Sequence, residues 1–366
     1  MDRHELSAWL RLLETPKLGR ESARTRLAAF GSPHAAIDAT TSARREVVGS
    51  TQAAALASAA ENVDALIAAT LAWLEAEAPE PRAVITLGDA RYPRALLDTA
   101  DPPLLLYAQG RFELLQADAI AVVGSRNPTP QGSDNARAFA GHLSRAGLTV
   151  VSGMALGVDA AAHAGGLDGA AGTIAVVGTG LDRVYPRRNL SLAHRIADKG
   201  LIVSEYSLGT PPLAPNFPLR NRIIAGLSRG TLVVEAALNS GSLITARLAN
   251  EAGRDVFAIP GSIHSPQSRG CHALIKQGAK LVETAQDILE ELRLPSAAAP
   301  AAAPAGLQAA DDPLLTALGF DPVTLDALAA RTGWPTSELN SRLLGLELEG
   351  HVARLPGQLF QRVARG

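Results

Sequence analysis

The chain has 366 residues, one cysteine and a net charge of −2 at pH 7, and 47% of its residues are hydrophobic. This length predicts two or three domains with at least one large core, and a single cysteine excludes an internal disulfide. No apolar run reaches the roughly 20 residues that a membrane-spanning helix needs, and the first residues lack the apolar segment of a signal peptide. We therefore expect a soluble cytoplasmic protein with no membrane insertion.

Residues 1–80 are rich in alanine and leucine at helical spacing, which predicts a small helical domain. The pattern breaks within "KLGRES", where we expect Gly19 to adopt a positive φ and Ser22 to cap the next helix. Two interpretations stay open. The segment is either a turn of the SAM or helix-hairpin-helix type, whose N–H groups hold a phosphate, or a plain connection between helices.

Residues 81–293 predict an α/β domain. Two short strands with proline-containing turns come first and read as an edge extension, and six short apolar runs then alternate with helices. Such runs are typical of strands that helices cover on both faces. We therefore expect an extended Rossmann-like, doubly wound parallel sheet, with any ligand beyond the carboxyl ends of the strands. The six runs are "AIAVVG", "LTVVSG", "TIAVVG", "LIVSE", "GTLVVEA" and "DVFAIPG".

Residues 294–312 are rich in proline and alanine and predict a linker. After it, residues 313–366 give a helix, a turn at Gly333, a second helix opened by Pro335 and Thr336, and two β-rich pieces, which is the order of a winged helix. The second helix is acidic along much of its length. Contact with DNA is therefore weakly supported there, and a protein contact or a structural role stays open.

The first strand of the parallel series ends in "VVGSRNPTPQG". Gly124 makes the turn, but the second and third glycines of a dinucleotide-binding loop are absent, and Arg126 occupies this loop. A guanidinium can bind a phosphate through two parallel hydrogen bonds. The alternative is a salt bridge between Arg126 and a neighbouring carboxylate.

The second strand ends in "SGMALGVDAAAH". We expect the backbone N–H groups around Ser152 and Gly153, together with the start of the next helix, to favour an anion. Asp159 and His163 stand four residues apart, which raises the possibility of a metal or acid–base pair. Because no third ligand is visible nearby, we interpret the pair as a hydrogen bond on a helix surface.

The third and fourth strand ends carry aromatic rings and arginines. Tyr185 precedes Arg187 and Arg188, and the loop after the fourth strand brings four further side chains before the predicted helix "RIIAGLS". Interleaved rings and cations are what single-stranded nucleic acid needs, because each base has a π-face and each linkage has a phosphate. The four side chains are Phe217, Arg220, Asn221 and Arg222.

The fifth strand leads to Ser240, Gly241 and Ser242, a small-residue turn at a helix start that suits an oxyanion. From Ala119 to Gly230 the chain has 11 basic and 6 acidic side chains, so the local balance is positive although the whole chain is nearly neutral. This excess either lines one positive cleft or is spread over solvated surface. The strand ends therefore predict a phosphate-binding rim.

The sequence shows no clear catalytic pair, and we expect no cofactor and no metal. Cys271 and His272 are adjacent, and in an extended segment their side chains would point apart. Glu205 and Glu235 could be acid–base groups, but we interpret both as members of buried networks.

Together these motifs resemble the DNA-processing protein A (DprA, or Smf) family, over about residues 87–282. The resemblance implies a non-catalytic, dimeric protein that binds and protects incoming single-stranded DNA and loads the RecA recombinase onto it during natural transformation and recombination. It places DNA-contacting basic residues at Arg126, Arg187 and Arg220. His272 departs from the asparagine more usual in the family. The matching stretches are "VVGSRNPTPQG", "SGMALGVDAAAH", "GTGLDRVYPRRN", "NFPLRNRIIAGLS", "SGSLITARLANEAGRDVFAIPG" and "GCHALIKQGAKLV".

Two other functions share features with parts of the sequence. Nucleoside-monophosphate phosphoribohydrolases share the G-S-R loop, but here Gly230, Thr231 and Glu235 lack the two glycines that such enzymes carry after a proline. A DNA-binding regulator acting through residues 313–366 is disfavoured by the acidic second helix.

Overall fold

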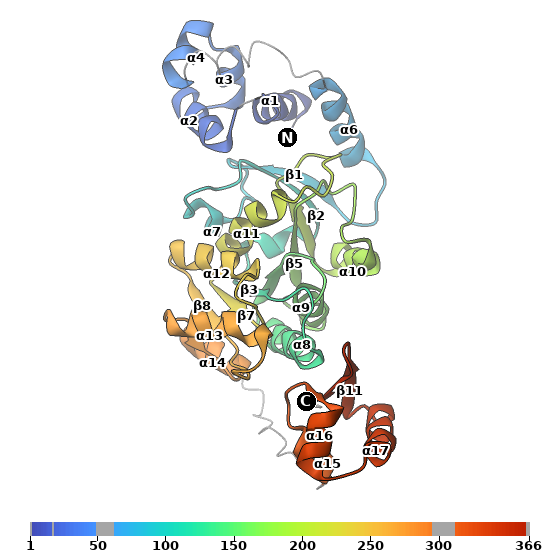
Figure 1. The fold of residues 1–366 in the computed structure, drawn as a ribbon. Helices are drawn as coiled ribbons and strands as arrows, with labels where there is room; N and C mark the ends of the chain where they lie inside the picture. Colours follow the sequence, from blue (N-terminus) through green and yellow to red (C-terminus); the bar gives the residue numbers. More distant parts are fainter. Residues whose placement is uncertain (1, 17, 49–61, 295–311, 364–366) are drawn as a thin grey trace.

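The computed structural model describes residues 2–16, 18–48, 62–294 and 312–363 (Figure 1). At its centre is a nine-stranded sheet in the order β1-β2-β6-β5-β4-β3-β7-β8-β9. The strands are β1 Arg82–Thr86, β2 Leu105–Gly110, β3 Ala119–Val123, β4 Thr149–Ser152, β5 Thr173–Val177, β6 Leu201–Ser204, β7 Gly230–Val233, β8 Asp255–Ala258 and β9 Lys280–Leu281.

The six predicted apolar runs form β3 to β8, and all neighbours from β6 to β9 pair in parallel. β3 lies between β4 and β7, so the chain leaves β3 toward one edge of the sheet and later returns to its other side. Beyond the carboxyl ends of the strands, the loops that leave β3 and β7 diverge toward helices on opposite faces. In doubly wound sheets, this point of reversal is where ligands bind.

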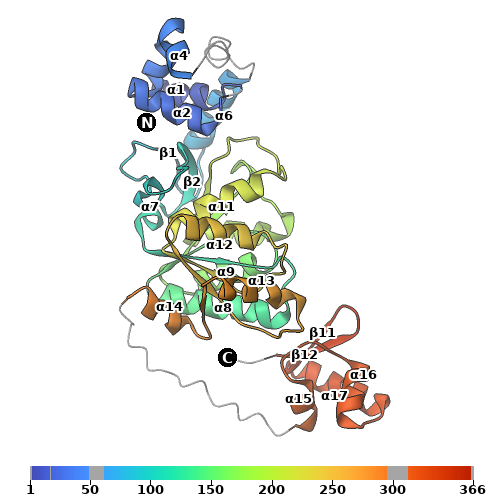
Figure 2. The same cartoon turned by 60° about the vertical axis from the view of Figure 1, so that its left-hand side comes forward.

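Helices cover both faces of this sheet (Figures 1 and 2). Alternate residues of β3 show the two sides, because Ile120 packs with the core of α8, α9 and α14, whereas Ala121 packs with that of α11, α12 and α13. The predicted doubly wound α/β class is confirmed. The helices are α7 Arg94–Leu97, α8 Pro130–Arg145, α9 Val158–Leu167, α10 Leu190–Lys199, α11 Asn216–Leu227, α12 Ser242–Glu251, α13 Arg269–Lys276 and α14 Ala285–Glu291, with 3-10 turns η1 Phe112–Gln116, η2 Arg187–Asn189 and η3 Pro266–Ser268.

The two predicted edge strands, β1 and β2, run antiparallel to each other, and β2 joins the sheet antiparallel to β6. Their outer face is covered by the N-terminal helices. Val84 and Tyr107 of these strands share one apolar core with Trp9 and Leu10. These helices are α1 Arg3–Leu13, α2 Arg20–Phe30, α3 Pro33–Asp38, α4 Thr41–Val48 and α6 Val63–Glu75.

The local prediction for the turn between α1 and α2 was wrong. Gly19 has φ −72° and is the N-cap of α2, so the helix begins at Arg20 and Ser22 lies inside it. Without a left-handed glycine, the turn does not have the conformation that the phosphate-binding interpretation assumed.

The C-terminal residues form a small unit with its own core, built around Leu315, Leu328, Leu343 and Phe360. Its helices and its three-stranded sheet, ordered β10-β12-β11, follow the predicted winged-helix pattern. The predicted linker at 294–312 lies almost wholly outside the described residues. Within those residues, no helix has the length and apolar character needed to cross a bilayer. The elements are α15 Pro313–Leu318, β10 Val323–Thr324, α16 Leu325–Thr332, α17 Thr336–Leu348, β11 Val352–Leu355 and β12 Leu359–Arg362.

The contact between α8 and α9 gives a test of the core. A Cβ on Gly165 would strike the carbonyl oxygen of Arg137 and would lie 3.0 Å from the Gly141 nitrogen, and backbone cannot move aside as a flexible side chain can. We expect Gly165→Ala to lower the free energy of unfolding by about 1–3 kcal/mol. Chemical denaturation measures this, with Gly88→Ala as the control because no atom lies within 4 Å of its Cβ position. Equal stability of the two variants would contradict the close contact.

Candidate functional site

A cavity of about 530 Å³ opens at the carboxyl end of β3, at the point where the strand order reverses. Four segments far apart in sequence line it: the loop after β3, the loop after β4, the first turns of α11, and the loop that leads into α12. Seven of the predicted site residues meet there. They are Arg126, Phe217, Arg220, Asn221, Ser240, Gly241 and Ser242.

The loop after β3 is fixed to its neighbours through backbone hydrogen bonds. The Ser125 N–H donates to the carbonyl of Glu235 at 2.7 Å, and the Ser125 carbonyl accepts from the Val158 N–H at 3.1 Å. Arg126 is exposed, and no carboxylate of the described residues forms a salt bridge with it. Its guanidinium carbon lies 5.9 Å from the centre of the Phe217 ring. This cation is therefore held over the cavity and remains available to an anion.

Arg220 is the second cation of the cavity, and only 4% of it is exposed. Its Nη1 donates to the Val176 carbonyl at 2.6 Å, while its Nε has no hydrogen-bond partner. Burial lowers the pKa of Arg220 to about 10, and the like charge of Arg126 acts in the same direction. Arg220 therefore stays charged at pH 7, and a phosphate between the two guanidinium groups would offset the cost of placing them together.

Asp159 occupies the place where the sequence predicted an anion. Asp159 lies in the first turn of α9, and its Oδ2 accepts from the N–H groups of Gly153 and Ala155, in the preceding loop, at 3.1 and 3.2 Å. Burial raises the pKa of this carboxyl, and the positive charge of Arg220 opposes the rise. The prediction of a phosphate cradle at Ser152 and Gly153 was wrong, because the protein supplies its own carboxylate.

Ser152 and Gly153 have packing roles instead. The Ser152 hydroxyl is fully buried and donates to the Val122 carbonyl at 2.7 Å, which ties β4 to β3. A Cβ on Gly153 would strike the guanidinium of Arg220. Glycine at this position is thus what allows Arg220 to approach the strand end.

The N-terminus of α12 is the third element that lines the cavity. The hydroxyl oxygens of Ser240 and Ser242 lie 2.7 Å apart, and Gly241 is the N-cap with no side chain to fill it. Asn221 approaches from α11, where its Nδ2 donates to the Gly241 carbonyl at 3.5 Å. The positive end of the α12 dipole therefore faces the same cavity as the two arginines.

The predicted loop after β6 becomes helical earlier than the sequence indicated. α11 begins at Asn216, so Phe217, Arg220 and Asn221 lie within its first two turns rather than in a loop. At about 100° per residue, these three share one face of the helix, and Arg222 points about 160° away from Arg220. Arg222 does not line the cavity, and its guanidinium is paired with Asp101 and Glu205.

An aromatic row borders the cavity. The rings of Tyr185 and Phe217 are 5.4 Å apart at a tilt of 34°, and Tyr185 is 47% exposed. Arg187 is exposed on η2 but is not among the residues that line the cavity. Asn189 anchors this turn by donating to the carbonyls of Met154 and Ala155 at 2.9 and 3.1 Å.

Among the polar residues that line the cavity, Asp159, Asn239 and Thr245 were not predicted as site residues. Thr245 follows Ser242 by three positions on α12 and so shares its face, which is a signal the sequence did contain. Asp159 was noticed but interpreted as a surface group, because nothing local reveals that Arg220 lies beside it.

His163 is buried, and the surface hydrogen bond predicted for it and Asp159 was wrong. The Thr173 hydroxyl donates to the Val150 carbonyl at 2.7 Å, so its oxygen must accept from Nδ1 of His163, also at 2.7 Å. Nε2 then accepts from the Met154 N–H at 3.3 Å. The neutral ring is fully hydrogen-bonded, and among the described residues no cluster of three potential ligands is arranged to hold a metal.

Glu235 caps a helix rather than facing the cavity. Its two carboxylate oxygens accept from the N–H and the hydroxyl of Thr129, at 2.9 and 2.6 Å, at the N-terminus of α8. Burial raises the pKa of this carboxyl. Glu235 and Glu205 are thus both partly buried and engaged, as members of networks, with Glu205 paired to Arg222.

Cys271 and His272 belong to α13, so the extended segment expected there was wrong. Neighbouring helical side chains still diverge, by about 100°. Burial raises the pKa of the Cys271 thiol to about 12, and Nε2 of His272 lies 3.0 Å from the carbonyl oxygen of Gly261. These two side chains do not form a nucleophile–base pair.

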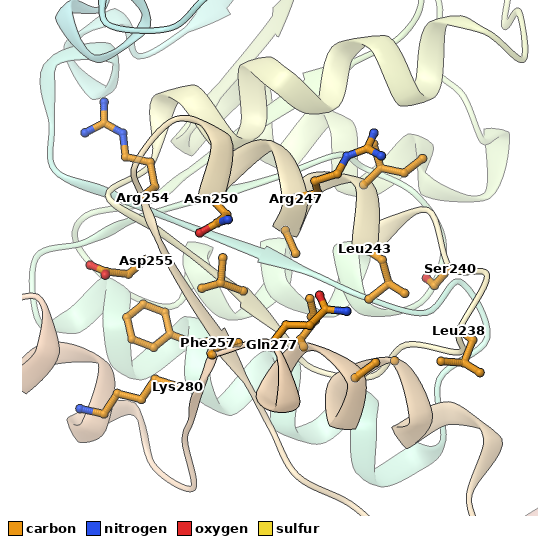
Figure 3. Close-up of a pocket in the computed structure, with 18 of the residues that line it drawn as sticks. Leu238, Ser240, Leu243, Arg247, Asn250, Arg254, Asp255, Phe257, Gln277 and Lys280 are labelled. Carbon is orange, nitrogen blue, oxygen red and sulfur yellow. The ribbon is translucent and has the colours of Figure 1, made fainter.

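A second cavity, of about 730 Å³, lies on the other side of α12 (Figure 3). It is larger, but its charged groups are already engaged. Lys280 pairs with Glu291, and Arg247 lies 3.6 Å from Glu251. Because it offers fewer unpaired cations than the cavity with Arg126, we consider it less suited to an anion.

The fold and the first cavity define a class of protein: a Rossmann-type α/β protein with a cavity lined by two arginines at its strand reversal and an appended winged helix. The chain belongs to the DNA recombination-mediator protein A family, whose model matches residues 83–293. The model of the DprA winged helix domain matches residues 298–358.

Known relatives agree with this assignment. Protein Smf of Escherichia coli is 43% identical over 80% of this chain and 79% of its own length. The structure of DNA processing protein A from Streptococcus pneumoniae aligns with a TM-score of 0.67 and 39% identity, covering 78% of this chain and 97% of that one. The Helicobacter pylori protein, described for its single-stranded DNA binding mode, aligns with a TM-score of 0.53 and 32% identity, covering 58% and 95%.

The buried histidine predicts a pH dependence of stability. Burial lowers the pKa of His163 to about 3, with the charge of Arg220 adding to the effect, against an ordinary value of 6.5. Below about pH 6.5 the unfolded chain therefore binds a proton that the folded chain does not. The free energy of unfolding consequently decreases as the pH is lowered. We expect the free energy of unfolding to drop by about 2 kcal/mol through this group between pH 7 and pH 5.

Chemical denaturation at the two pH values measures the drop. A His163→Gln variant should lose this part of the pH dependence, whereas the control His142→Gln, at an exposed position of α8, should keep it. An unchanged pH dependence in His163→Gln would show that the ring does not carry it.

Proposed function

We propose that this protein binds single-stranded DNA in the cavity at the end of β3 and loads the RecA recombinase onto that strand. The observation that carries the proposal is the convergence of Arg126, Arg220 and the N-terminus of α12 on one cavity beside the Phe217 ring. Two cations and a helix N-terminus suit a phosphate, and the ring suits a base. None of these groups reads the edge of a particular base.

The relatives support the same function. The Helicobacter pylori neighbour is described as binding single-stranded DNA, and the family is named for mediating recombination. We extend this to protection of incoming DNA during natural transformation, in the cytoplasm and as a homodimer. Two linked copies of the cavity would raise the local concentration of one strand and so strengthen binding.

The rival function, cleavage of nucleoside monophosphates, needs a carboxylate at the scissile bond. Glu235 was its candidate, and this carboxylate is taken up by Thr129 at the start of α8. The remaining carboxylate at the cavity, Asp159, accepts from the backbone N–H groups of Gly153 and Ala155 in the loop before α9 and lies beside Arg220. We therefore propose a protein that binds DNA without catalysing a reaction.

The first test concerns Arg126. Charge reversal by Arg126→Glu should weaken binding of single strands of any sequence by about 10- to 100-fold, because a charge-assisted hydrogen bond is replaced by repulsion. It should also flatten the dependence of log K on log salt by about 0.7 for each phosphate that the variant no longer neutralises. Titration of a labelled single strand and its duplex across a salt series measures both.

The matched control is Arg137→Glu, an exposed arginine of α8 that pairs with Asp168. It should bind as the unchanged protein does. Equal affinity of the unchanged protein for single strand and duplex at moderate salt would overturn the proposal.

The second test concerns RecA. On strands coated by a single-strand binding protein, the unchanged protein should speed RecA filament formation, and Arg126→Glu should not, because loading requires that the strand be held. The rate of ATP hydrolysis by RecA measures filament formation. Analytical ultracentrifugation of the protein alone tests whether it is a dimer.

Release of base from nucleoside monophosphates, if it is abolished in Glu235→Gln, would instead favour the phosphoribohydrolase function.

A further inference from the structure

Arg222 lies at the centre of an ion-pair cluster on the far side of α11 from the cavity. Its Nε is 2.7 Å from Asp101, and its Nη2 bonds to Glu205, the residue that follows β6. The Arg222 side chain is only 12% exposed. Both edges of its guanidinium are thus occupied by carboxylates, which leaves no open fork for a phosphate.

The same two carboxylates also bind the N-terminal helical domain. Arg20 of α2 lies 3.0 Å from Asp101 and 3.4 Å from Glu205, and Arg24, one turn further along, pairs with Asp101. Arg20 and Arg24 are about one-third and one-quarter exposed. At this level of burial, ion pairs are better shielded from solvent than surface pairs are.

Two rim loops of the cavity region also pack on the helical domain. Leu181 and Leu208 contact the apolar core that Trp9 and Leu10 form, and the Ser207 hydroxyl donates to Glu14 of this domain. Leu208 belongs to the loop that leads into α11, and Leu181 to the loop that leads to Tyr185. The helical domain is therefore linked to α11 through the carboxylates that pair with Arg222. It also contacts the loops that contain Leu181 and Leu208.

We propose that Arg222 is a positioning residue, and that through Arg20 and Arg24 the helical domain strengthens single-stranded DNA binding without touching the strand. This rests on the proposed function of the cavity. Because α11 is a rigid rod, its rotation about its own axis decides where Phe217, Arg220 and Asn221 point. The cluster fixes that rotation from the opposite face.

The experiment uses the full chain and a labelled single-stranded oligonucleotide of mixed sequence. We expect Arg24→Met to weaken binding roughly fivefold, a size typical of coupled groups in one network. The slope of log K against log salt should not change, because every cation that faces a phosphate is kept. Arg222→Lys should behave in the same way, since one ammonium cannot bridge two carboxylates as a guanidinium does. The control is Arg11→Met, which removes an arginine that pairs with Asp64 inside the helical domain.

A double-mutant cycle separates positioning from general destabilisation. If Arg24 acts by orienting Phe217, then Arg24→Met should cost about fivefold in the unchanged background but less than about twofold in Phe217→Ala. Partial unfolding would weaken both backgrounds by the same factor. Should Arg24→Met fail to fold, as judged by thermal unfolding, Arg20→Gln removes a more exposed arm of the cluster and takes its place in the cycle.

The outcomes are distinct. If the unchanged protein does not bind single strands, the proposed function fails. If it binds, and Arg24→Met and Arg222→Lys bind equally well, the positioning role fails while the proposed function stands. A third variant, Arg222→Gln, removes the charge, and a salt slope reduced by about 0.7 in it would show that Arg222 itself neutralises a phosphate and would also overturn the positioning role.

Discussion

The pairing of β3 with β4 on one side and β7 on the other is the constraint on which the site depends. A parallel sheet needs a crossover between successive strands, and at β3 the two crossovers pass over opposite faces. The loops that leave β3 and β7 at their carboxyl ends therefore diverge, toward α8 on one face and α12 on the other, and leave a hollow. Arg126 and Ser240 are brought together there although more than 100 positions separate them in the sequence.

The burial of Arg220 is the second condition for this cavity. A guanidinium with 4% exposure is stable only where its neighbours compensate it, and here the Val176 carbonyl and the nearby Asp159 do so in part. The compensation is incomplete, since Nε has no hydrogen-bond partner. Gly153 permits this arrangement, because any side chain there would displace the guanidinium.

The sheet and half of the site could be predicted because their signals are local. Six short apolar runs predicted the six strands β3 to β8, and the small residues at 240–242 predicted the start of a helix. The segment 216–222 was mistaken for a loop because Pro215 and Pro218 precede its apolar part. Proline is tolerated in the first turn of a helix, where its missing N–H would have no partner in any case. That one difference moved Arg222 to the opposite face.

The roles of Asp159 and Glu235 could not be predicted, because each depends on partners that only the tertiary fold supplies. Glu235 binds Thr129, which is 106 positions away. Asp159 bonds to nearby amides, but the cation that acts on it, Arg220, belongs to α11 and is about 60 positions distant. The sequence around a carboxylate does not show whether its side chain is exposed to solvent or bonded at the end of a helix.

Helices α8 and α12 both begin around the end of β3, and the protein supplies a carboxylate to the first of them. Glu235 lies at the N-terminus of α8, whereas the first turn of α12 contains no acidic residue and its N-cap, Gly241, has no side chain. A strand held at one such point through its repeating phosphates has no preferred starting nucleotide. Shifting it by one unit would present an equivalent phosphate to α12 and an equivalent base to Phe217. Under the proposed function, a bound strand would thus exchange among many registers of equal energy, and could be drawn onward by a partner without first being released.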